Sequence, residues 1–330
     1  MRSVGWVVVG MLTAAAVLSL DPAVVGLSEV TPMLQVIALR GLLAAVLLVL
    51  GVGLIVIGAI LLRAARRRGT RGAGPQALVL GLVSVLIAAG HVGVLVERGL
   101  ARNDPLGATQ DGAIDVLTIN TFGTAGGVAP VVALIEQIDP DVVALQETPV
   151  ADADRIADLL GGDYQVFSDT TGPQPVQATA LLVAESLGDY VLATPPDTTF
   201  GGVWARPADG DGPELFSVHL IPPMVGRVGT WRDELAVVTQ LCARVPGAVV
   251  AGDLNATVDH ATLRDGACVD GSVEVGGLGT WPTDRPALLG APIDHVLADP
   301  GSWRPVASQV LDAPGAGDHR ALLVRLVPAG

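Results

Sequence analysis

Residues 249–257 read VVAGDLNAT, a run of small apolar residues that ends in an acid and an amide two positions apart. The apolar residues are typical of a buried strand, and on a strand this spacing places Asp253 and Asn255 on the same face. Both side chains would emerge at the carboxyl end of the strand, where open α/β sheets bind their ligands. The alternative is a turn in which both side chains cap backbone groups, so the surrounding sequence must decide.

Short β-branched runs alternate with longer amphipathic runs from Ala113 onward, which predicts one α/β domain of about 220 residues. A helix is expected over 230–244, with Thr230 and Asp233 forming a capping box. The other predicted helices cover 128–138 and 156–160. The predicted strands cover 114–119, 142–145, 164–168, 178–184, 189–193, 202–206, 215–219, 247–252, 293–297, 306–311 and 321–327.

Polar residues stand at the ends of several of these strands. Asn120 and Glu147 each follow an apolar run, and His219 ends another. Asp294 and the pair Asp318-His319 place acids next to histidines. Each residue has an ordinary structural explanation, such as a capped turn or a satisfied core histidine. Their recurrence in a chain with five histidines favours one shared site.

Three apolar runs precede this domain, and we interpret residues 1–96 as a membrane anchor. The predicted spans are residues 4–20, 41–62 and 76–96. The first is a retained helix or a signal peptide, and we favour the helix. Residues 97–112 form a polar linker that could reach at most about 50 Å.

The arginines between the second and third runs predict the topology. Arg63, Arg66, Arg67, Arg68 and Arg71 indicate a cytoplasmic loop by the positive-inside rule. A nucleic-acid patch is the rival interpretation. We therefore expect a multi-pass protein of the plasma membrane with residues 113–330 on the extracytoplasmic side.

The charge of the domain disfavours long nucleic acids. Residues 103–330 contain 30 acidic residues and 10 arginines, a formal net charge of −20, and the chain has no lysine. Such a surface repels polyanions, whose binding rests on Lys and Arg. The two cysteines, Cys242 and Cys268, are expected to form a disulfide if the domain lies outside the cytoplasm, and without a CxxC spacing they make a zinc site improbable.

An ordered set of motifs resembles the endonuclease/exonuclease/phosphatase superfamily, which includes DNase I, neutral sphingomyelinases and inositol polyphosphate 5-phosphatases. The motifs are LTINTFG, VVALQET, FSVHL, VVAGDLNAT, PIDHVLA and GDHRALLV, within residues 113–327. The resemblance implies a four-layer fold of two packed β-sheets flanked by helices, and metal-dependent cleavage of a phosphoester. The helical anchor before an external domain is also similar to teicoplanin-resistance membrane proteins, which act on polyprenyl pyrophosphate.

The resemblance also implies roles for individual residues. Glu147 would be the main ligand of Mg²⁺ or Mn²⁺, because hard oxygen ligands suit these ions. Asn120 would hold the metal or a phosphate oxygen, and Asp318 would complete a second metal position. We expect no role in chemistry for His260 or His295.

Five residues would act on the substrate. Asp294 would orient His319, Asp253 would orient or deprotonate the attacking water, and either Asp253 or His319 would be the base. Asn255 would bind a phosphoryl oxygen, and His219 would bind phosphate by donating a hydrogen bond or a proton. Asp169, Gln174 and Arg227 are further candidates without a motif.

The expected function is a membrane-anchored, metal-dependent phosphoesterase that acts outside the cytoplasm on a lipid-linked or small phosphate or pyrophosphate. The lipid bilayer and that substrate are the expected partners, and no protein partner is predicted. An extracytoplasmic DNase and a catalytically silent binding domain are the two alternatives. The complete motif set favours an enzyme over the silent relative.

Overall fold

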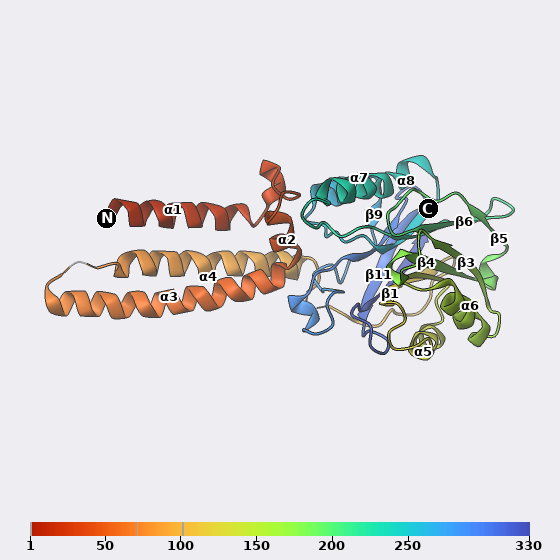
Figure 1. The fold of residues 1–330 in the computed structure, drawn as a ribbon, viewed down its shortest axis with the longest axis horizontal. Coiled ribbons are helices and arrows are strands. Elements are labelled where there is room, and N and C mark those ends of the chain that lie inside the picture. Colours follow the sequence, from red (N-terminus) through yellow and green to blue (C-terminus); the bar gives the residue numbers. More distant parts are fainter. Residues whose placement is uncertain (1, 71, 101) are drawn as a thin grey trace. The chain divides into compact units, whose positions relative to one another are not determined.

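The computed structural model describes residues 2–70, 72–100 and 102–330, and the chain divides into two compact units, Met1–Glu97 and Arg98–Gly330. Figure 1 shows the fold with its elements labelled. The first unit is helical, and the second contains every strand that the structure describes. The predicted α/β sandwich is confirmed.

The first unit contains α1 (Arg2–Leu18), η1 (Pro22–Val25), α2 (Met33–Ala38), α3 (Arg40–Arg68) and α4 (Gly74–Glu97). Both α3 and α4 are long and apolar enough to cross a membrane. The apolar α1 is shorter, at 17 residues, so the expected third span stays a prediction. The η1 turn and α2 lie in a segment that the sequence did not predict to be helical.

Glycines allow α3 and α4 to pack closely. A Cβ at Gly81 would lie 2.7 Å from the carbonyl oxygen of Gly51, and a Cβ at Gly58 would lie 2.9 Å from the backbone nitrogen of Leu78. Small residues at such contacts are typical of helix pairs in membranes. The expected arginine loop is shorter than predicted, because Arg63 to Arg68 belong to the end of α3. Cations at a helix carboxyl end are favourable with the helix dipole.

The second unit has two six-stranded sheets. The first sheet has the order β11-β12-β1-β2-β4-β3 and the second has the order β5-β6-β7-β8-β10-β9. The first consists of β1 (Ile114–Asn120), β2 (Val142–Gln146), β3 (Tyr164–Thr170), β4 (Ala178–Ala184), β11 (Trp303–Leu311) and β12 (Ala321–Pro328). The second consists of β5 (Tyr190–Ala193), β6 (Gly202–Pro207), β7 (Glu214–His219), β8 (Ala248–Asp253), β9 (Val269–Asp270) and β10 (Asp294–Ala298).

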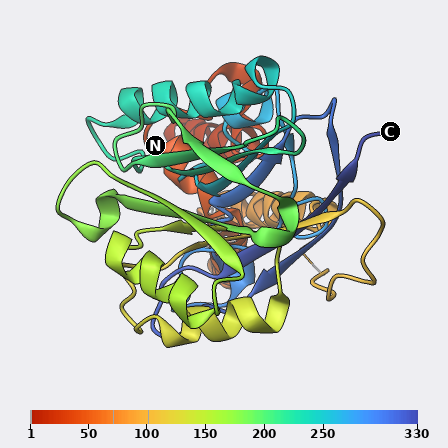
Figure 2. The same ribbon diagram turned by 90° about the vertical axis from the view of Figure 1, so that its right-hand side faces the viewer.

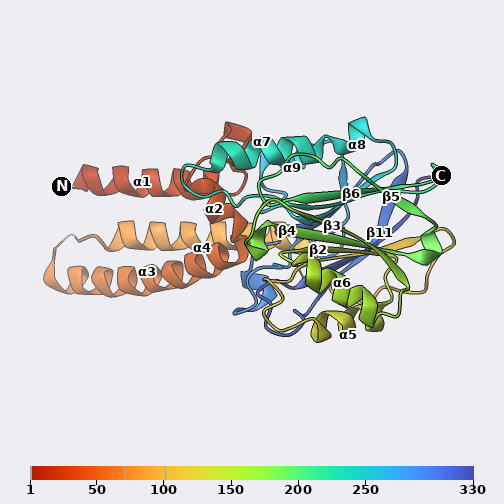
Figure 3. The same cartoon turned by 45° about the vertical axis from the view of Figure 1, so that its right-hand side comes forward.

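Helices cover the outer face of each sheet. Figures 2 and 3 show α5 (Ala129–Ile138) and α6 (Val150–Leu159) on one side and α7 (Val228–Thr239) with α8 (Leu241–Arg244) on the other. The short α9 (Ala261–Arg264) contacts α7. Three further single turns are η2 (Pro175–Gln177), η3 (Glu185–Leu187) and η4 (Ala287–Leu289).

Alternating side chains of the strands build separate apolar cores. On β1, Val116 belongs to the core between the two sheets, whereas Leu117 belongs to the core beneath α5 and α6. On β8, Val249 faces the other sheet and Val250 packs in the core beneath α7. Because both faces of these strands are buried, their sequences are continuously apolar, as the run before Asp253 is.

The expected capping box on α7 is wrong. The helix begins at Val228, two residues earlier than predicted, and its N-cap residue Arg227 makes no side-chain capping bond. Thr230 and Asp233 therefore lie inside the helix. The helix predicted over 230–244 is divided at Gln240 into α7 and α8. The strand β9, helix α9 and the η turns were not predicted, because segments of two to four residues give too little pattern to be recognised.

Gly252 is required where β8 lies beside β7. A Cβ at this position would lie 1.9 Å from the carbonyl oxygen of Val218, a backbone atom that cannot move aside cheaply. We expect Gly252→Ala to destabilise the protein by roughly 2–3 kcal/mol, measured by thermal unfolding of the full chain in detergent. Gly229→Ala on α7 is the control, because a Cβ there meets nothing within 4 Å. Equal unfolding temperatures for the two variants would contradict this assignment.

Candidate active site

The candidate site lies where the ends of six strands meet. Asn120 ends β1, and Glu147 directly follows β2. In the other sheet His219, Asp253 and Asp294 lie in register across β7, β8 and β10. His319 precedes β12, whose first residues lie at the same end because β12 runs antiparallel to β1.

Asn120 connects two carboxylates. Its Nδ2 donates to Glu147 Oε1 at 3.0 Å and to Asp253 Oδ2 at 3.2 Å, while its Oδ1 accepts the Phe122 backbone N–H at 3.0 Å. Since the backbone N–H can only donate, these partners fix which amide atom is the oxygen. These contacts position Asn120 between the two carboxylates, and its expected role in holding the metal or a phosphate oxygen stays a prediction.

Two site residues have strained backbones. Glu147 and Asn255 have φ angles of +51° and +48°, in the left-handed region that non-glycine residues seldom adopt. Such conformations cluster at functional sites, where the surrounding structure holds them. The turn at Asn255 lets its backbone N–H donate to Asp253 Oδ1 at 2.9 Å, and its Nδ2 donates to the carbonyl oxygen of Leu220 at 2.9 Å.

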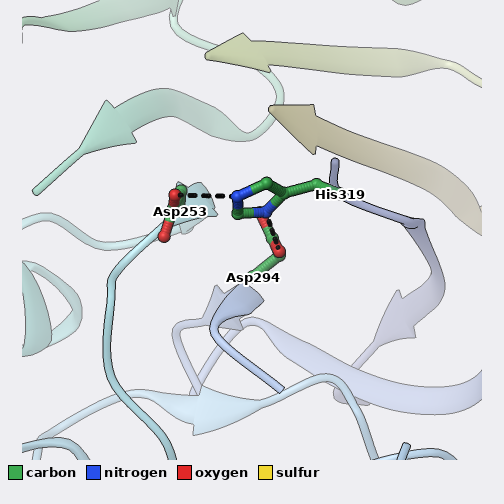
Figure 4. A group of neighbouring side chains, drawn as sticks. All are labelled: Asp253, Asp294 and His319. Atoms are coloured by element: carbon green, nitrogen blue, oxygen red, sulfur yellow. Dashed lines mark hydrogen bonds and ion pairs between the residues drawn. The ribbon is translucent and has the colours of Figure 1, made fainter. Parts of the chain in front are cut away.

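His319 and Asp294 form the expected pair. The His319 Nδ1–H donates to Asp294 Oδ2 at 2.8 Å, and Nε2 lies 3.8 Å from Asp253 Oδ2 (Figure 4). Burial lowers the pKa of His319, but the carboxylates of Asp294 and Asp253 outweigh it and raise that pKa to about 9. His319 is therefore an imidazolium at neutral pH, with one N–H directed at Asp294 and the other toward Asp253.

The pKa of Asp253 is also raised, which for a carboxyl group favours the neutral form. Burial and the nearby charge of Asp294 raise its pKa from 3.8 to about 7, against the lowering effect of His319 and of the hydrogen bonds from Asn255 and Asn120. Burial also raises the pKa of Glu147. Carboxylates that are costly to ionise in a buried group are characteristic of catalytic and metal-binding sites.

His219 differs from its expected role as a donor. Its Nδ1 faces the carbonyl oxygen of Val176 at 3.2 Å, and because a carbonyl only accepts, Nδ1 carries the proton. Burial lowers the pKa of His219 to about 3, so the ring is neutral. Its Nε2 is then an acceptor, 3.6 Å from Asp253 Oδ2 and 4.0 Å from Glu147 Oε1. This geometry argues against proton donation by His219.

A divalent cation fits this arrangement. Three acceptor atoms converge, namely Glu147 Oε1, Asp253 Oδ2 and His219 Nε2, and both carboxylates have raised pKa values. Asp253, Asp294 and His319 also offer atoms within 4.8 Å of one another that could hold a metal. We favour Glu147 as the main ligand, since it is a hard oxygen ligand with an 18% exposed side chain, whereas Asp294 is already paired with His319.

Asp318 lies beside the site without joining it. Its Oδ2 accepts the Trp281 Nε1–H at 3.2 Å, and its Oδ1 is buried with no hydrogen-bond partner. Its charge raises the pKa of both His319 and Glu147. A second metal position at Asp318 stays a prediction.

Several polar residues were not singled out from the sequence. Thr280 Oγ1 accepts the Asp294 backbone N–H at 3.3 Å, and Trp281 bonds Asp318. Gln146 Nε2 donates to Ser217 Oγ at 3.3 Å, which links the two sheets below the site. Gln146 lies in the VVALQET motif, whereas nothing in the sequence around Thr280 or Trp281 signals a site. In the described residues Asp169, Gln174 and Arg227 make no hydrogen bond or ion pair with the site.

The remaining histidines are structural, as expected. His260 accepts the Thr257 backbone N–H and packs edge-on against Trp231. His295 points away from the site, since its Nδ1 lies 2.8 Å from Asp270 Oδ2 and its Nε2 lies 2.9 Å from the carbonyl oxygen of Ala256. Both ring nitrogens of His295 face acceptors, which requires the imidazolium.

A disulfide joins Cys242 on α8 to Cys268, with their Cα atoms 5.2 Å apart. It closes a segment of the chain that includes Asp253 and ends two residues before Asp270, the partner of His295. A link of this kind stabilises mainly by restricting the unfolded chain.

Residues 117–319 match the Endonuclease/Exonuclease/phosphatase family. A humanised TDP2 from D. rerio has a similar fold, with 16% identity and a TM-score of 0.52 over 66% of this chain and 99% of that one. An endonuclease/exonuclease/phosphatase from Beutenbergia cavernae is 20% identical, with a TM-score of 0.51 over 66% of this chain and 72% of that one. No curated protein matches by sequence.

The His295–Asp270 pair predicts a pH-dependent stability. Burial lowers the pKa of His295, but Asp270 and the Ala256 carbonyl outweigh it and raise it to about 8, from 6.5 when unfolded. This pKa shift contributes about 2 kcal/mol to the free energy of unfolding. The contribution is fully present below pH 6.5 and is lost as the pH rises through 8. The carboxylate of Asp270 has a lowered pKa, because the pair with His295 overcomes the effect of burial, so its contribution is lost in acid.

We therefore expect the unfolding temperature of the full chain in detergent to fall as the pH rises from 6.5 to 8.5. The fall should be larger than that of the Asp270→Asn variant over the same range. The variant lacks the carboxylate that holds the proton on His295, so the difference between the two curves isolates this pair from the other titrating groups. Parallel curves over this range would show that the pair does not contribute.

Proposed function

The chain belongs to the endonuclease/exonuclease/phosphatase family, and on this basis we propose that it is a metal-dependent phosphoesterase anchored in a membrane. The observation that carries the proposal is the convergence of Asn120, Glu147, Asp253 and the His319–Asp294 pair at one end of the sandwich. Hydrolases of this family act on phosphate esters. A silent binding domain would have no need to keep a buried imidazolium beside a carboxylate of raised pKa.

Asp253 is the better candidate for the general base. His319 is held as an imidazolium by Asp294, so at neutral pH it has no lone pair with which to accept a proton. The Asp253 carboxylate has a pKa of about 7, close to the value at which a general base is most effective near neutral pH. It would take a proton from the attacking water.

The other residues would stabilise the charge that develops on the phosphoryl group. The His319 imidazolium is the nearest cationic donor to Asp253, and Asn255 retains a second amide N–H besides the one that it donates to Leu220. Fixed donors are most effective when they meet a charge that grows in the transition state. A divalent cation held by Glu147 would act as a Lewis acid that offsets the negative charge of the phosphate.

We propose a lipid-linked or small phosphate as the substrate. A unit with a net charge near −20 and no lysine cannot gain affinity for long DNA by releasing counterions. A single phosphate group contacts only the site and is not held against the rest of the acidic surface. The two long apolar helices support confinement in a membrane, which raises the effective concentration of any substrate in the same plane. The arginines at the end of α3 support an extracytoplasmic site by the positive-inside rule.

Metal dependence is tested on the full chain in detergent with a soluble chromogenic phosphoester. EDTA should abolish hydrolysis, and Mg²⁺ or Mn²⁺ should restore it. Glu147→Gln should lower the rate by at least ~10²-fold, because the amide keeps the shape and loses the charge. The control Glu136→Gln changes an exposed acid on α5 and should retain full activity. Hydrolysis that survives exhaustive chelation would refute the metal mechanism.

The substrate class is tested with a panel on the full chain in nanodiscs with Mg²⁺. The panel contains polyprenyl pyrophosphate, phospholipids, sphingomyelin, inositol phosphates and plasmid DNA. We expect turnover of a lipid-linked phosphate to exceed DNA cleavage by at least ~10-fold, on the charge argument above. Efficient cutting of DNA without turnover of any lipid would establish the nuclease alternative instead.

A further inference from the structure

Residues 98–100 and 102–106 form a connector that packs against the rest of the second unit. Both terminal nitrogens of the Arg98 guanidinium donate to the Asp259 carboxylate at 2.9 Å, and the Arg98 carbonyl accepts the Gly277 N–H at 3.0 Å. Leu100 packs on the core between the sheets, and Asn103 exchanges two 2.8 Å hydrogen bonds with the backbone of Val310. The segment expected to be a free linker is thus held by specific contacts from its second residue onward.

Arg98 enters the unit at the end that carries the site. Its partner Asp259 belongs to the loop that follows Asp253 and Asn255. Gly277 lies two residues before Gly279, which leads into Thr280, and Thr280 accepts the Asp294 backbone N–H. Glu97 is the last residue of α4, so Arg98 follows the proposed membrane anchor directly in the sequence.

Exposed apolar side chains lie on loops at the same end. Met224 and Val225 are 52% and 85% exposed, in the loop between His219 and α7. Phe122 is 50% exposed, and its backbone N–H contacts Asn120. Trp281 is 37% exposed, and its indole contacts Asp318. We name these four residues the apolar rim.

We infer that the apolar rim is a bilayer-docking surface. Docking would place the open end of the site at the membrane interface, with the rim side chains in contact with the lipid chains beside the scissile phosphate. The inference rests on the proposed function for its substrate. Large apolar side chains around a site mark an interaction surface, and Trp and Phe favour the membrane interface. The bilayer is the partner that this connection favours, because Arg98 directly follows α4 in the chain, and α4 is long and apolar enough to cross a membrane.

The charge of the unit requires docking to be hydrophobic. A surface with a net charge near −20 is repelled by anionic lipids, and no lysine is present to bind them. Docking should therefore be at least as strong on phosphatidylcholine as on membranes with anionic lipid, and should not weaken in high salt. A basic docking surface would behave in the opposite way.

The direct test places a fluorescent label at the rim. Because Cys242 and Cys268 are joined, Val225→Cys introduces the sole free thiol of the chain. A bimane label on this variant, with the full chain in phosphatidylcholine nanodiscs, should be quenched by lipids that carry a nitroxide on the acyl chain and protected from aqueous iodide. The control Leu159→Cys lies at the opposite end of α6 from the site and is 50% exposed, so it should show the reverse.

Iodide quenching of the Val225 label equal to that of the Leu159 label would overturn the inference, as would docking that requires anionic lipid.

The activity test uses Val225→Asp, which should lower kcat/KM for a membrane-embedded phosphate by at least ~10-fold, through a higher KM, and leave the hydrolysis of a soluble phosphoester unchanged. Lipid quenching without lipid hydrolysis would retain the docking surface and refute the proposed substrate. Lipid hydrolysis that is unaffected by Val225→Asp, with the label exposed to iodide, would retain the function and refute the docking surface.

Discussion

The position of Asp253 is the constraint on which the rest of the site depends. Three strands hold it in register, because His219 lies beside it on β7 and Asp294 lies beside it on β10. Two further residues reach it from the other sheet, Asn120 through a hydrogen bond and His319 through its Nε2. Since buried polar groups need partners, the alignment of the strands and the network of side chains stabilise one another.

The site combines one positively charged side chain, the His319 imidazolium, with several carboxylate and amide oxygen atoms. His319 keeps its proton because Asp294 faces one nitrogen and Asp253 lies near the other, whereas His219 loses its charge because it is buried near His319. At neutral pH His319 is therefore charged and His219 is neutral, because the two side chains have different neighbours. This division gives the site a charge-stabilising group and a set of metal-binding acceptors side by side.

The connector at Arg98 and the candidate site share one end of the second unit. The connector reaches that end at Arg98, and the exposed apolar residues extend from loops that begin at site residues. A loop that follows a strand can carry both a site residue and a surface residue within a few positions, as His219 and Val225 do. The same strand ends can thereby position the chemistry and the surface that meets its substrate.

The local sequence pattern predicted an α/β domain, most of its strands and the long helices α3 and α4. The resemblance of its motifs to a known family implied the two-sheet sandwich and the roles of the candidate site residues. Continuous apolar runs such as residues 249–252 specify buried strands, and polar residues directly after them mark the strand ends. The tertiary structure decided what depends on neighbours from distant positions: the tautomer of His219 set by Val176, the engagement of both amide atoms of Asn120, and the attachment of Arg98 to Asp259. Periodicity records which face of a strand is buried, but partners that are many residues apart are chosen only when the sheets pack.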